Sequence, residues 1–292
     1  MFDPYSVDAL VLAGGGCRCF WQAGFLEVVA PEIELRPVEV AAVSAGSAMA
    51  CMVFGDAVEE GLAYFLERTE RNERNVYPGN LWGDEPVFPH ERIYRDTILH
   101  ACDAAAFSRL RDGPDIRVLL SRPPAWLGPL GGVAVGFLVY ETEKRLSPSV
   151  HPTLTQQLGF EPDVVSIEAC ATPLELAELV LHSSCTPPFT PIYERDGRPV
   201  LDGGLVDNVP VKALTPRVTK VLVLLTRRYP REAIPESDDR LYVQPSRPIP
   251  IDKWDYASPD LVRATLDLGR RDGEAFLRTY ANTVQRPSMR RS

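Results

Sequence analysis

The sequence predicts an α/β protein whose central sheet is mostly parallel and covered by helices on both faces. Short apolar runs of β-favouring residues alternate along the chain with longer segments of helical periodicity. The first apolar run ends in three consecutive glycines, and the second ends in a serine followed by small residues. Both transitions are typical of a strand that turns sharply into a helix.

The N-terminal elements follow one another in a regular order. Residues 9–13 are apolar and stop at the glycines 14–16, which predicts a buried strand entering a glycine turn. Residues 20–29 carry apolar side chains at helical spacing and complete a βα unit. Residues 38–43 predict a second strand, and residues 46–66 predict a single helix that begins with small residues.

The rest of the chain continues this alternation with longer interruptions. Residues 71–90 are polar and rich in turn-forming residues, and we interpret them as an excursion or a lid. The remaining predicted strands are 116–120, 164–167 and 221–225, and the remaining predicted helices are 174–181 and 261–280.

One segment, 123–140, is almost wholly apolar. Its run from Trp126 to Tyr140 is shorter than the roughly 20 residues of a spanning helix and contains a proline, so a membrane span is the least favoured interpretation. Gly128, Gly132 and Gly136 recur every four residues and would form one smooth face of a helix. We interpret the segment as a buried element with a glycine-lined contact, with a wall over a lipid-binding cleft as the alternative.

Composition and charge exclude several classes of protein. Lys and Arg total 31 and Asp and Glu total 40, and the net charge of −9 disfavours non-specific nucleic-acid binding. The 27 prolines outnumber the 20 glycines, which predicts many loops. The six cysteines are too sparse for a disulfide framework, and the sequence contains no metal-ligand constellation. Because no signal peptide or transmembrane helix is evident, we expect a cytoplasmic protein.

Ser44 is the first candidate catalytic residue. It lies between a predicted strand and a predicted helix, and Ala42 and Gly46 leave room for a tight turn. Such a nucleophile elbow presents a serine hydroxyl at the carboxyl end of a strand, where open α/β sheets bind ligands. The common pattern is G-x-S-x-G, so Ala42 stands where the first glycine is usual. Taken alone, Ser44 would more often be interpreted as a helix N-cap.

The glycine loop Gly14-Gly15-Gly16 offers two interpretations. A glycine loop that leads into a helix can bind phosphate, or its backbone N–H groups can stabilise an oxyanion. A dinucleotide site would have glycine at Cys19 and an acidic residue where the second strand ends, and a P-loop would have G-K-[ST]. The sequence has none of these, which favours the oxyanion interpretation.

Asp202 is the second candidate catalytic residue. It precedes Gly203 and Gly204, so the backbone there can approach another group closely. We interpret all four histidines of the chain as structural residues, because none follows a strand late in the chain as a hydrolase histidine does; they are His90, His100, His151 and His182. Asp202 can instead accept the proton of Ser44 directly.

These motifs together resemble those of the patatin-like phospholipases and lipid acyl hydrolases. Gly14-Gly15-Gly16-x-Arg18 resembles the family's glycine-rich oxyanion motif, and Val43–Gly46 resembles its serine elbow. Asp202-Gly203-Gly204 resembles its D-G-[GA] motif, and Ser183–Pro191 resembles the serine- and proline-containing segment before it. The resemblance covers residues 8–66 and 163–226 and the closing helix.

The resemblance implies a three-layer α/β/α fold and a Ser–Asp dyad. Ser44 would attack an acyl ester of a lipid or phospholipid, Asp202 would act as base and then as acid, and an acyl-enzyme would form without a cofactor or metal. The supporting residues at the elbow and the aspartate would be Ala42, Gly46, Gly203 and Gly204. The expected oxyanion-hole residues are Gly14, Gly15, Gly16, Cys17 and Arg18. Ala42 and Cys19 depart from the family pattern and could narrow the approach of substrate.

The resemblance also bears on domains and partners. Because motifs from both ends of the chain would meet at one site, we expect a single catalytic domain, 1–292, with 71–160 as a variable cap or insert. The acidic net charge predicts that any peripheral membrane contact is apolar and transient. A catalytically weak module that binds acyl lipid or a protein partner is the alternative function, and the sequence does not indicate an oligomeric state.

Overall fold

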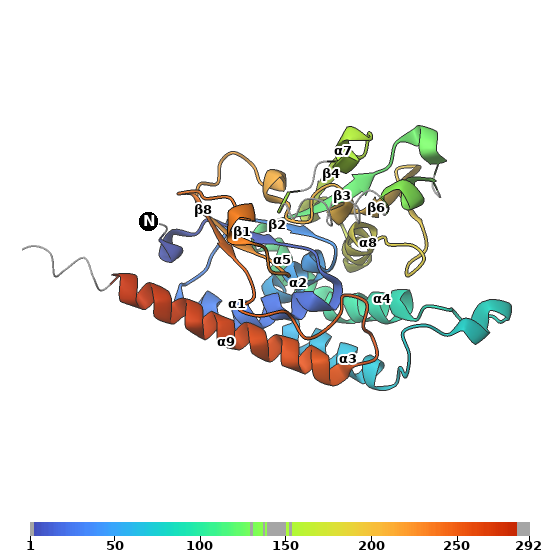
Figure 1. Ribbon diagram of the computed structural model, residues 1–292, viewed down its shortest axis with the longest axis horizontal. Coiled ribbons are helices and arrows are strands. Elements are labelled where there is room, and N and C mark those ends of the chain that lie inside the picture. Colours follow the sequence, from blue (N-terminus) through green and yellow to red (C-terminus); the bar gives the residue numbers. More distant parts are fainter. Residues whose placement is uncertain (1–2, 129–130, 137, 139–149, 152–153, 285–292) are drawn as a thin grey trace, which may run out of the picture.

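The computed structural model describes residues 3–128, 131–136, 138, 150–151 and 154–284 (Figure 1). The strands are β1 (Ala9–Leu12), β2 (Glu39–Val43), β3 (Asp115–Arg122), β4 (Glu161–Ser166), β5 (Tyr193–Arg195), β6 (Arg198–Asp202), β7 (Val221–Leu224) and β8 (Arg240–Val243). In the part of the chain that is described, they form one eight-stranded sheet in the order β5-β6-β3-β2-β1-β7-β8, with β4 also paired to β3.

The sheet is mostly parallel, as the sequence predicted. Strand β1 pairs in parallel with β2 and with β7, β2 with β3, and β7 with β8. The pairs β3–β4, β3–β6 and β5–β6 are antiparallel. All residues of β1, β2 and β7 are buried, which is typical of parallel strands covered on both faces. The predicted α/β class with a mostly parallel central sheet is therefore confirmed.

The helices and the sheet enclose the largest hydrophobic core. The helices are α1 (Phe20–Glu32), α2 (Ala45–Phe54), α3 (Val58–Glu70), α4 (His90–Ala101), α5 (Ala104–Arg111), α7 (Leu154–Gln157), α8 (Pro173–Ser183) and α9 (Pro259–Val284). Alternate residues of β1 face this core, with Leu10 and Leu12 packed among helix side chains. Ala9 and Val11 face a second cluster on the other side of the sheet, formed with segments around Val209.

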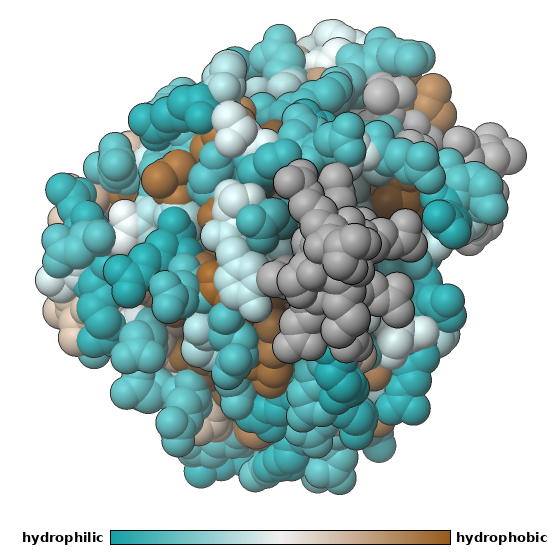
Figure 2. All heavy atoms as spheres, turned by 90° about the vertical axis from the view of Figure 1, so that its left-hand side faces the viewer, coloured by the Kyte–Doolittle hydropathy of each residue, from teal (hydrophilic) through white to brown (hydrophobic). Residues whose placement is uncertain are grey.

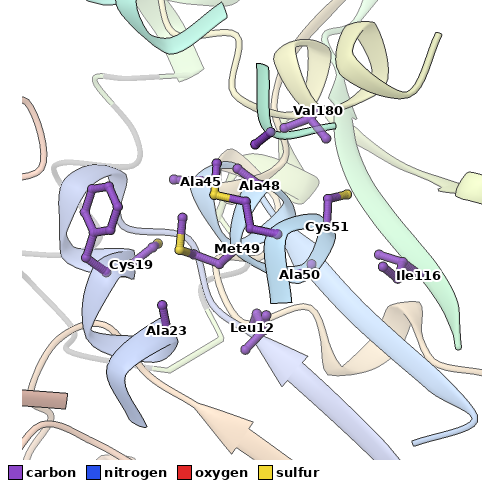
Figure 3. Close-up of a cluster of buried hydrophobic side chains, with 14 of the residues drawn as sticks. Leu12, Cys19, Ala23, Ala45, Ala48, Met49, Ala50, Cys51, Ile116 and Val180 are labelled. Carbon is purple, nitrogen blue, oxygen red and sulfur yellow. The ribbon is translucent and has the colours of Figure 1, made fainter. Parts of the chain in front are cut away.

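Helix α2 lies at the centre of the main core, as Figure 3 shows. Its sequence is apolar on every side, and this pattern is typical of a helix that is enclosed all round. Met49 and Cys51 share this core with Leu12 of β1, Ile116 of β3 and Val180 of α8. At Gly46, a Cβ atom would lie 2.6 Å from the carbonyl oxygen of Leu12, so only glycine allows α2 to approach β1 this closely.

The prediction of a single helix over 46–66 is wrong. Two helices occupy this region, α2 and α3, and Gly55, Asp56 and Ala57 separate them. The Gly55 N–H donates to the carbonyl of Cys51 at the end of α2, and Asp56 has a φ of 50°. A left-handed residue ends an α-helix, and Asp adopts this conformation more readily than most side chains do.

The segment predicted as an excursion or lid links α3 to α4. It contains a short 3₁₀ helix, Pro78–Trp82, and Figure 1 shows this turn projecting from the rest of the molecule. The Trp82 side chain at this turn is 90% exposed. A role for the segment as a lid stays a prediction.

Part of the apolar segment 123–140 lies outside the described residues. Residues 131–136 are helical. A Cβ on Gly132 would lie 2.7 Å from Pro123, and one on Gly136 would lie 3.1 Å from Phe160, so both glycines make close contacts. Gly128 has no neighbouring atom within 4 Å of such a Cβ. Gly132 and Gly136 thus belong to the predicted glycine-lined contact, and Gly128 does not.

None of the helices in the described ranges is both long and apolar enough to span a membrane. Figure 2 shows that one face of the molecule is largely hydrophilic, with apolar residues scattered over it. Such scattered apolar residues are ordinary on a protein surface.

Helix α9 packs along α1, and glycines on both helices allow the close approach (Figure 1). A Cβ on Gly24 would lie 2.1 Å from the carbonyl oxygen of Leu266, and one on Gly269 would lie 2.2 Å from that of Trp21. The Trp21 Nε1–H also donates to Asp272 Oδ2 at 2.8 Å. The two helices are therefore held at one separation by backbone contact.

We expect Gly269→Ala to lower the free energy of unfolding by about 1–3 kcal/mol, because the added methyl group forces the two helices apart. Gly79→Ala is the matched control, since a Cβ at Gly79 meets no atom within 4 Å. Urea unfolding of both variants followed by circular dichroism measures the difference. Equal stability of the two variants would contradict the close packing of α1 and α9.

Candidate active site

Strand β3 brings the two candidate catalytic residues together. Its residue Leu119 pairs with Val43 at the end of β2, and the next residue, Leu120, pairs with Asp202 at the end of β6. The chain then leaves β2 at Ser44. As a result, the Ser44 hydroxyl donates a hydrogen bond to Asp202 Oδ2 over 2.6 Å.

The turn at Ser44 is strained and specifically supported. Its φ of 54° and ψ of −136° are rare for a residue with a side chain, and such a conformation costs on the order of 1–3 kcal/mol. The Ser44 N–H donates to the Ser183 hydroxyl at 2.8 Å, and that hydroxyl donates to the carbonyl of Leu119 at 2.7 Å. The Ser44 side chain makes no capping bond to α2. Ser44 therefore stands at the N-cap position of α2, but its hydroxyl bonds to Asp202 and does not cap the helix.

Asp202 is partly buried and accepts hydrogen bonds on both oxygens. Oδ1 accepts the N–H of Gly204 at 2.7 Å, and Oδ2 accepts the hydroxyls of Ser44 and, at 3.3 Å, Thr186. Loss of solvent raises the pKa of Asp202 above its usual range and outweighs these hydrogen bonds and the nearby Lys253, which act in the opposite direction. A carboxylate with a raised pKa is a stronger base, which suits proton transfer from a hydroxyl.

Only some of the backbone N–H groups of the glycine loop donate to acceptors within the protein. The N–H groups of Gly14, Cys17 and Arg18 donate to backbone carbonyls of the protein. For Gly15 and Gly16, the described residues provide no acceptor, and both line the cavity at Ser44. Of the five residues expected to form an oxyanion hole, Gly15 and Gly16 therefore have backbone N–H groups without an acceptor among the described residues.

Gly16 is required by the shape of this loop. Its φ is +57°, and a Cβ there would lie 2.1 Å from the carbonyl oxygen of Lys253. The same neighbouring segment holds Arg18, whose Nε donates to the carbonyl of Ile251 at 3.3 Å and whose Nη2 lies 3.1 Å from Asp252 Oδ2. The Arg18 guanidinium therefore fixes the glycine loop against the segment before α9.

The two departures from the family pattern lie outside the cavities at Ser44. Ala42 is fully buried in the main core, and the Cys19 thiol lies 3.6 Å from the carbonyl oxygen of Ala13. Among the described residues that line the cavities at Ser44, neither is present. The structure gives no support to a narrowed approach of substrate at these two positions.

The sequence patterns missed several residues that support the site. Asn208 Nδ2 donates to the carbonyl of Gly14 at 3.1 Å, and the Thr226 hydroxyl donates to the same carbonyl at 2.5 Å. With Ser183 and Thr186, they hold the loop and the dyad in place. Ser183 begins the segment Ser183–Pro191, whose sequence resembles that of the family. This resemblance could have identified Ser183 as a residue of the site.

Two cavities of different character meet at Ser44. The first is the more polar of the two and contains the glycine loop and Asp202; it is lined by Gly14, Gly15, Gly16, Arg18, Ser44, Thr186, Asp202, Gly204, Leu205, Asn208, Thr226, Arg227, Lys253 and Trp254. The second is largely aromatic; it is lined by Gly16, Ser44, Ala45, His90, Tyr94, Ser184, Phe189, Thr190, Trp254 and Tyr256. A group bound to Ser44 can therefore extend into either cavity.

The four histidines lie in four different environments. His182 lies outside both cavities, and its burial, helped by nearby arginines, lowers its pKa to about 4. His90 lines the aromatic cavity, with Nε2 2.9 Å from the carbonyl oxygen of Trp254. His100 stacks on a tyrosine, and His151 lies 3.2 Å from a carboxylate oxygen outside the cavities. Within the described ranges, no cluster of three or more ionisable side chains could hold a metal ion.

A serine at a strand-to-helix turn, bonded to a carboxylate beside a glycine loop, is an arrangement typical of serine hydrolases. The family model of the patatin-like phospholipases matches residues 10–215, and the chain belongs to this family. The family suggests lipid acyl hydrolase activity. A solved structure of VipD from Legionella pneumophila is similar with a TM-score of 0.39 and 11% identity, covering 90% of this chain and 67% of that one. None of the curated proteins matches the sequence.

The raised pKa of Asp202 predicts how its replacement changes stability. A carboxyl whose pKa is raised by folding stabilises the fold only when protonated, so this contribution is lost as the pH rises through the folded-state pKa. We therefore expect Asp202→Asn to have a Tm at pH 7 equal to or above that of the unmodified protein. The difference should shrink as the pH falls toward the ordinary aspartate pKa. A clearly lower Tm of the variant at pH 7 would instead indicate a structural role for Asp202.

Proposed function

We propose that the chain is a serine acyl hydrolase that cleaves fatty-acyl esters of lipids or phospholipids with a Ser–Asp dyad. The observation that carries the proposal is the 2.6 Å hydrogen bond from the Ser44 hydroxyl to Asp202. The family assignment supports a lipid ester as substrate. Residues 1–292 would then act as one catalytic domain, since residues from both halves of the chain line the first cavity.

Ser44 is the nucleophile in the proposed reaction. As its oxygen attacks the ester carbonyl carbon, Asp202 accepts the hydroxyl proton and a tetrahedral intermediate forms. The intermediate collapses when Asp202 gives this proton to the leaving alcohol oxygen, which breaks the ester bond and leaves an acyl group on Ser44. Water then attacks the acyl-enzyme, with Asp202 taking the proton from water and returning it to Ser44.

The negative charge of the intermediate is stabilised by the glycine loop. The N–H groups of Gly15 and Gly16 are the donors proposed for the oxyanion, because they are not bonded within the described chain. Arg18 keeps this loop in position through Ile251 and Asp252. Pre-positioned donors of this kind commonly provide the largest part of the rate increase, which compensates for a carboxylate acting as base.

The two cavities would hold the two parts of the ester. Asp202 must reach the leaving oxygen in order to protonate it, so the alcohol part belongs in the first cavity, which Asp202 lines. The acyl chain then occupies the aromatic cavity, where Phe189 stacks on Trp254 with ring centroids 4.4 Å apart. Any membrane contact needed to load the lipid would be apolar and transient, because the chain is acidic.

Ser44→Ala is expected to lower the turnover of p-nitrophenyl butyrate by at least about a thousandfold, since it removes the nucleophile. Ser121→Ala is the matched control, because Ser121 is a buried serine outside both cavities and its hydroxyl has no partner among the described residues. Asp202→Asn should also abolish turnover. A fluorophosphonate probe should label Ser44, as located by peptide mass spectrometry. Equal turnover by the Ser44→Ala variant and the unmodified protein would refute the proposal and leave a lipid-binding module.

His182→Ala tests the dyad against a histidine triad. Because His182 lies outside both cavities, we expect kcat/KM for the same ester to stay within about twofold of the unmodified protein. The activity of the unmodified protein should fall as the pH is lowered through the raised pKa of Asp202, because the protonated carboxyl cannot accept the serine proton. Loss of turnover in a folded His182→Ala variant would indicate a triad.

A further inference from the structure

The cavity that contains Asp202 is rich in positive charge, although the whole chain is acidic. Of the described residues that line it, Arg18, Arg227 and Lys253 are cationic and Asp202 is the acidic one. The chain as a whole has a net charge of −9. The excess of positive charge is therefore local to this cavity, where it attracts an anion.

Arg227 differs from Arg18 in how its charge is compensated. Arg18 forms an ion pair with Asp252 at 3.1 Å. Arg227 is held by Tyr229 instead: its Nε donates to the tyrosine hydroxyl at 2.6 Å, and its guanidinium carbon lies 4.6 Å from the ring centroid. Among the residues that the structure describes, no carboxylate lies within ion-pair distance of Arg227. A tyrosine thus fixes the guanidinium without neutralising it.

The position of Arg227 relates its charge to one part of the substrate. Arg227 lies beyond the end of β7 and is the neighbour of Thr226 in the chain. The Thr226 hydroxyl donates to the carbonyl of Gly14 in the glycine loop. The proton transfer from Asp202 requires the alcohol part of the ester to lie in this same cavity. Arg227 and Lys253 therefore face the alcohol part, while the acyl chain lies on the aromatic side of Ser44.

We propose that Arg227 is a specificity-determining residue that binds a phosphate group on the alcohol part of the substrate, with Lys253 as a second cation. This inference rests on the proposed function. A guanidinium can bind two phosphate oxygens at once, and such charge-assisted bonds are stronger than neutral ones. The preferred substrate is then an acyl ester of a phosphorylated alcohol rather than a neutral glyceride.

Two esters that differ only in the phosphate test the proposal: 1-octanoylglycerol 3-phosphate and 1-octanoylglycerol. We expect kcat/KM of the unmodified protein to be at least about tenfold higher for the phosphate ester, and Arg227→Gln to reduce this preference by about tenfold. Arg227→Lys should retain part of it. Arg228→Gln is the matched control, since Arg228 is the exposed neighbour outside the cavity. Equal rates for the two esters, or an equal loss on both in Arg227→Gln, would overturn the proposal.

A binding measurement separates this inference from the proposed function. Calorimetry on the Ser44→Ala variant should show tighter binding of the phosphate ester than of the neutral ester, and adding Arg227→Gln should remove the difference. If no ester is turned over but this preference is measured, the proposed function fails and the phosphate site stands. If esters are turned over without a preference, the phosphate site fails alone. Equal competition by inorganic phosphate and by glycerol 3-phosphate would indicate a site for free phosphate and would also overturn it.

Discussion

The pairing of β3 with two different strands is the constraint on which the site depends. Leu119 and Leu120 are consecutive, and they fix the end of β2 and the end of β6 beside each other. Ser44 and Asp202 are 158 residues apart in the chain, yet this register places their side chains in hydrogen-bond contact. Because side chains alternate along a strand, a shift of β6 by one residue would turn Asp202 to the opposite face of the sheet.

The surrounding core supports conformations that would be unfavourable in isolation. Ser44 has strained backbone angles, and Asp202 has lost solvent, so both residues favour unfolding of the local structure. The enclosed helix α2, which begins directly after Ser44, opposes this tendency because its apolar surface is buried on every side. Ser183 connects the Ser44 N–H to β3 and thereby couples the turn to the sheet.

The sequence predicted those features that are encoded locally. The strand at 9–13, its glycine turn and the turn at Ser44 depend on neighbouring residues, and the structure contains each of them. The break at Gly55 was missed because apolar periodicity continues across it into α3. The aromatic cavity could not be predicted, since Phe189 and Trp254 come from distant loops and meet only through tertiary packing. Ser183 and Thr226 support the site through equally long-range hydrogen bonds.

In the proposed reaction, the placement of Ser44 at the junction of the two cavities would determine the direction in which an ester binds. The aromatic cavity offers few partners for a charged group, and the first cavity is lined by Arg227, Lys253 and the proposed proton donor, Asp202. A reversed ester would place its apolar chain against charged side chains and its leaving oxygen away from Asp202, so it would lose burial and protonation together. Charge, apolar surface and the single carboxylate therefore favour the same orientation. In the proposed reaction, the difference in polarity between the two cavities would serve catalysis as well as binding.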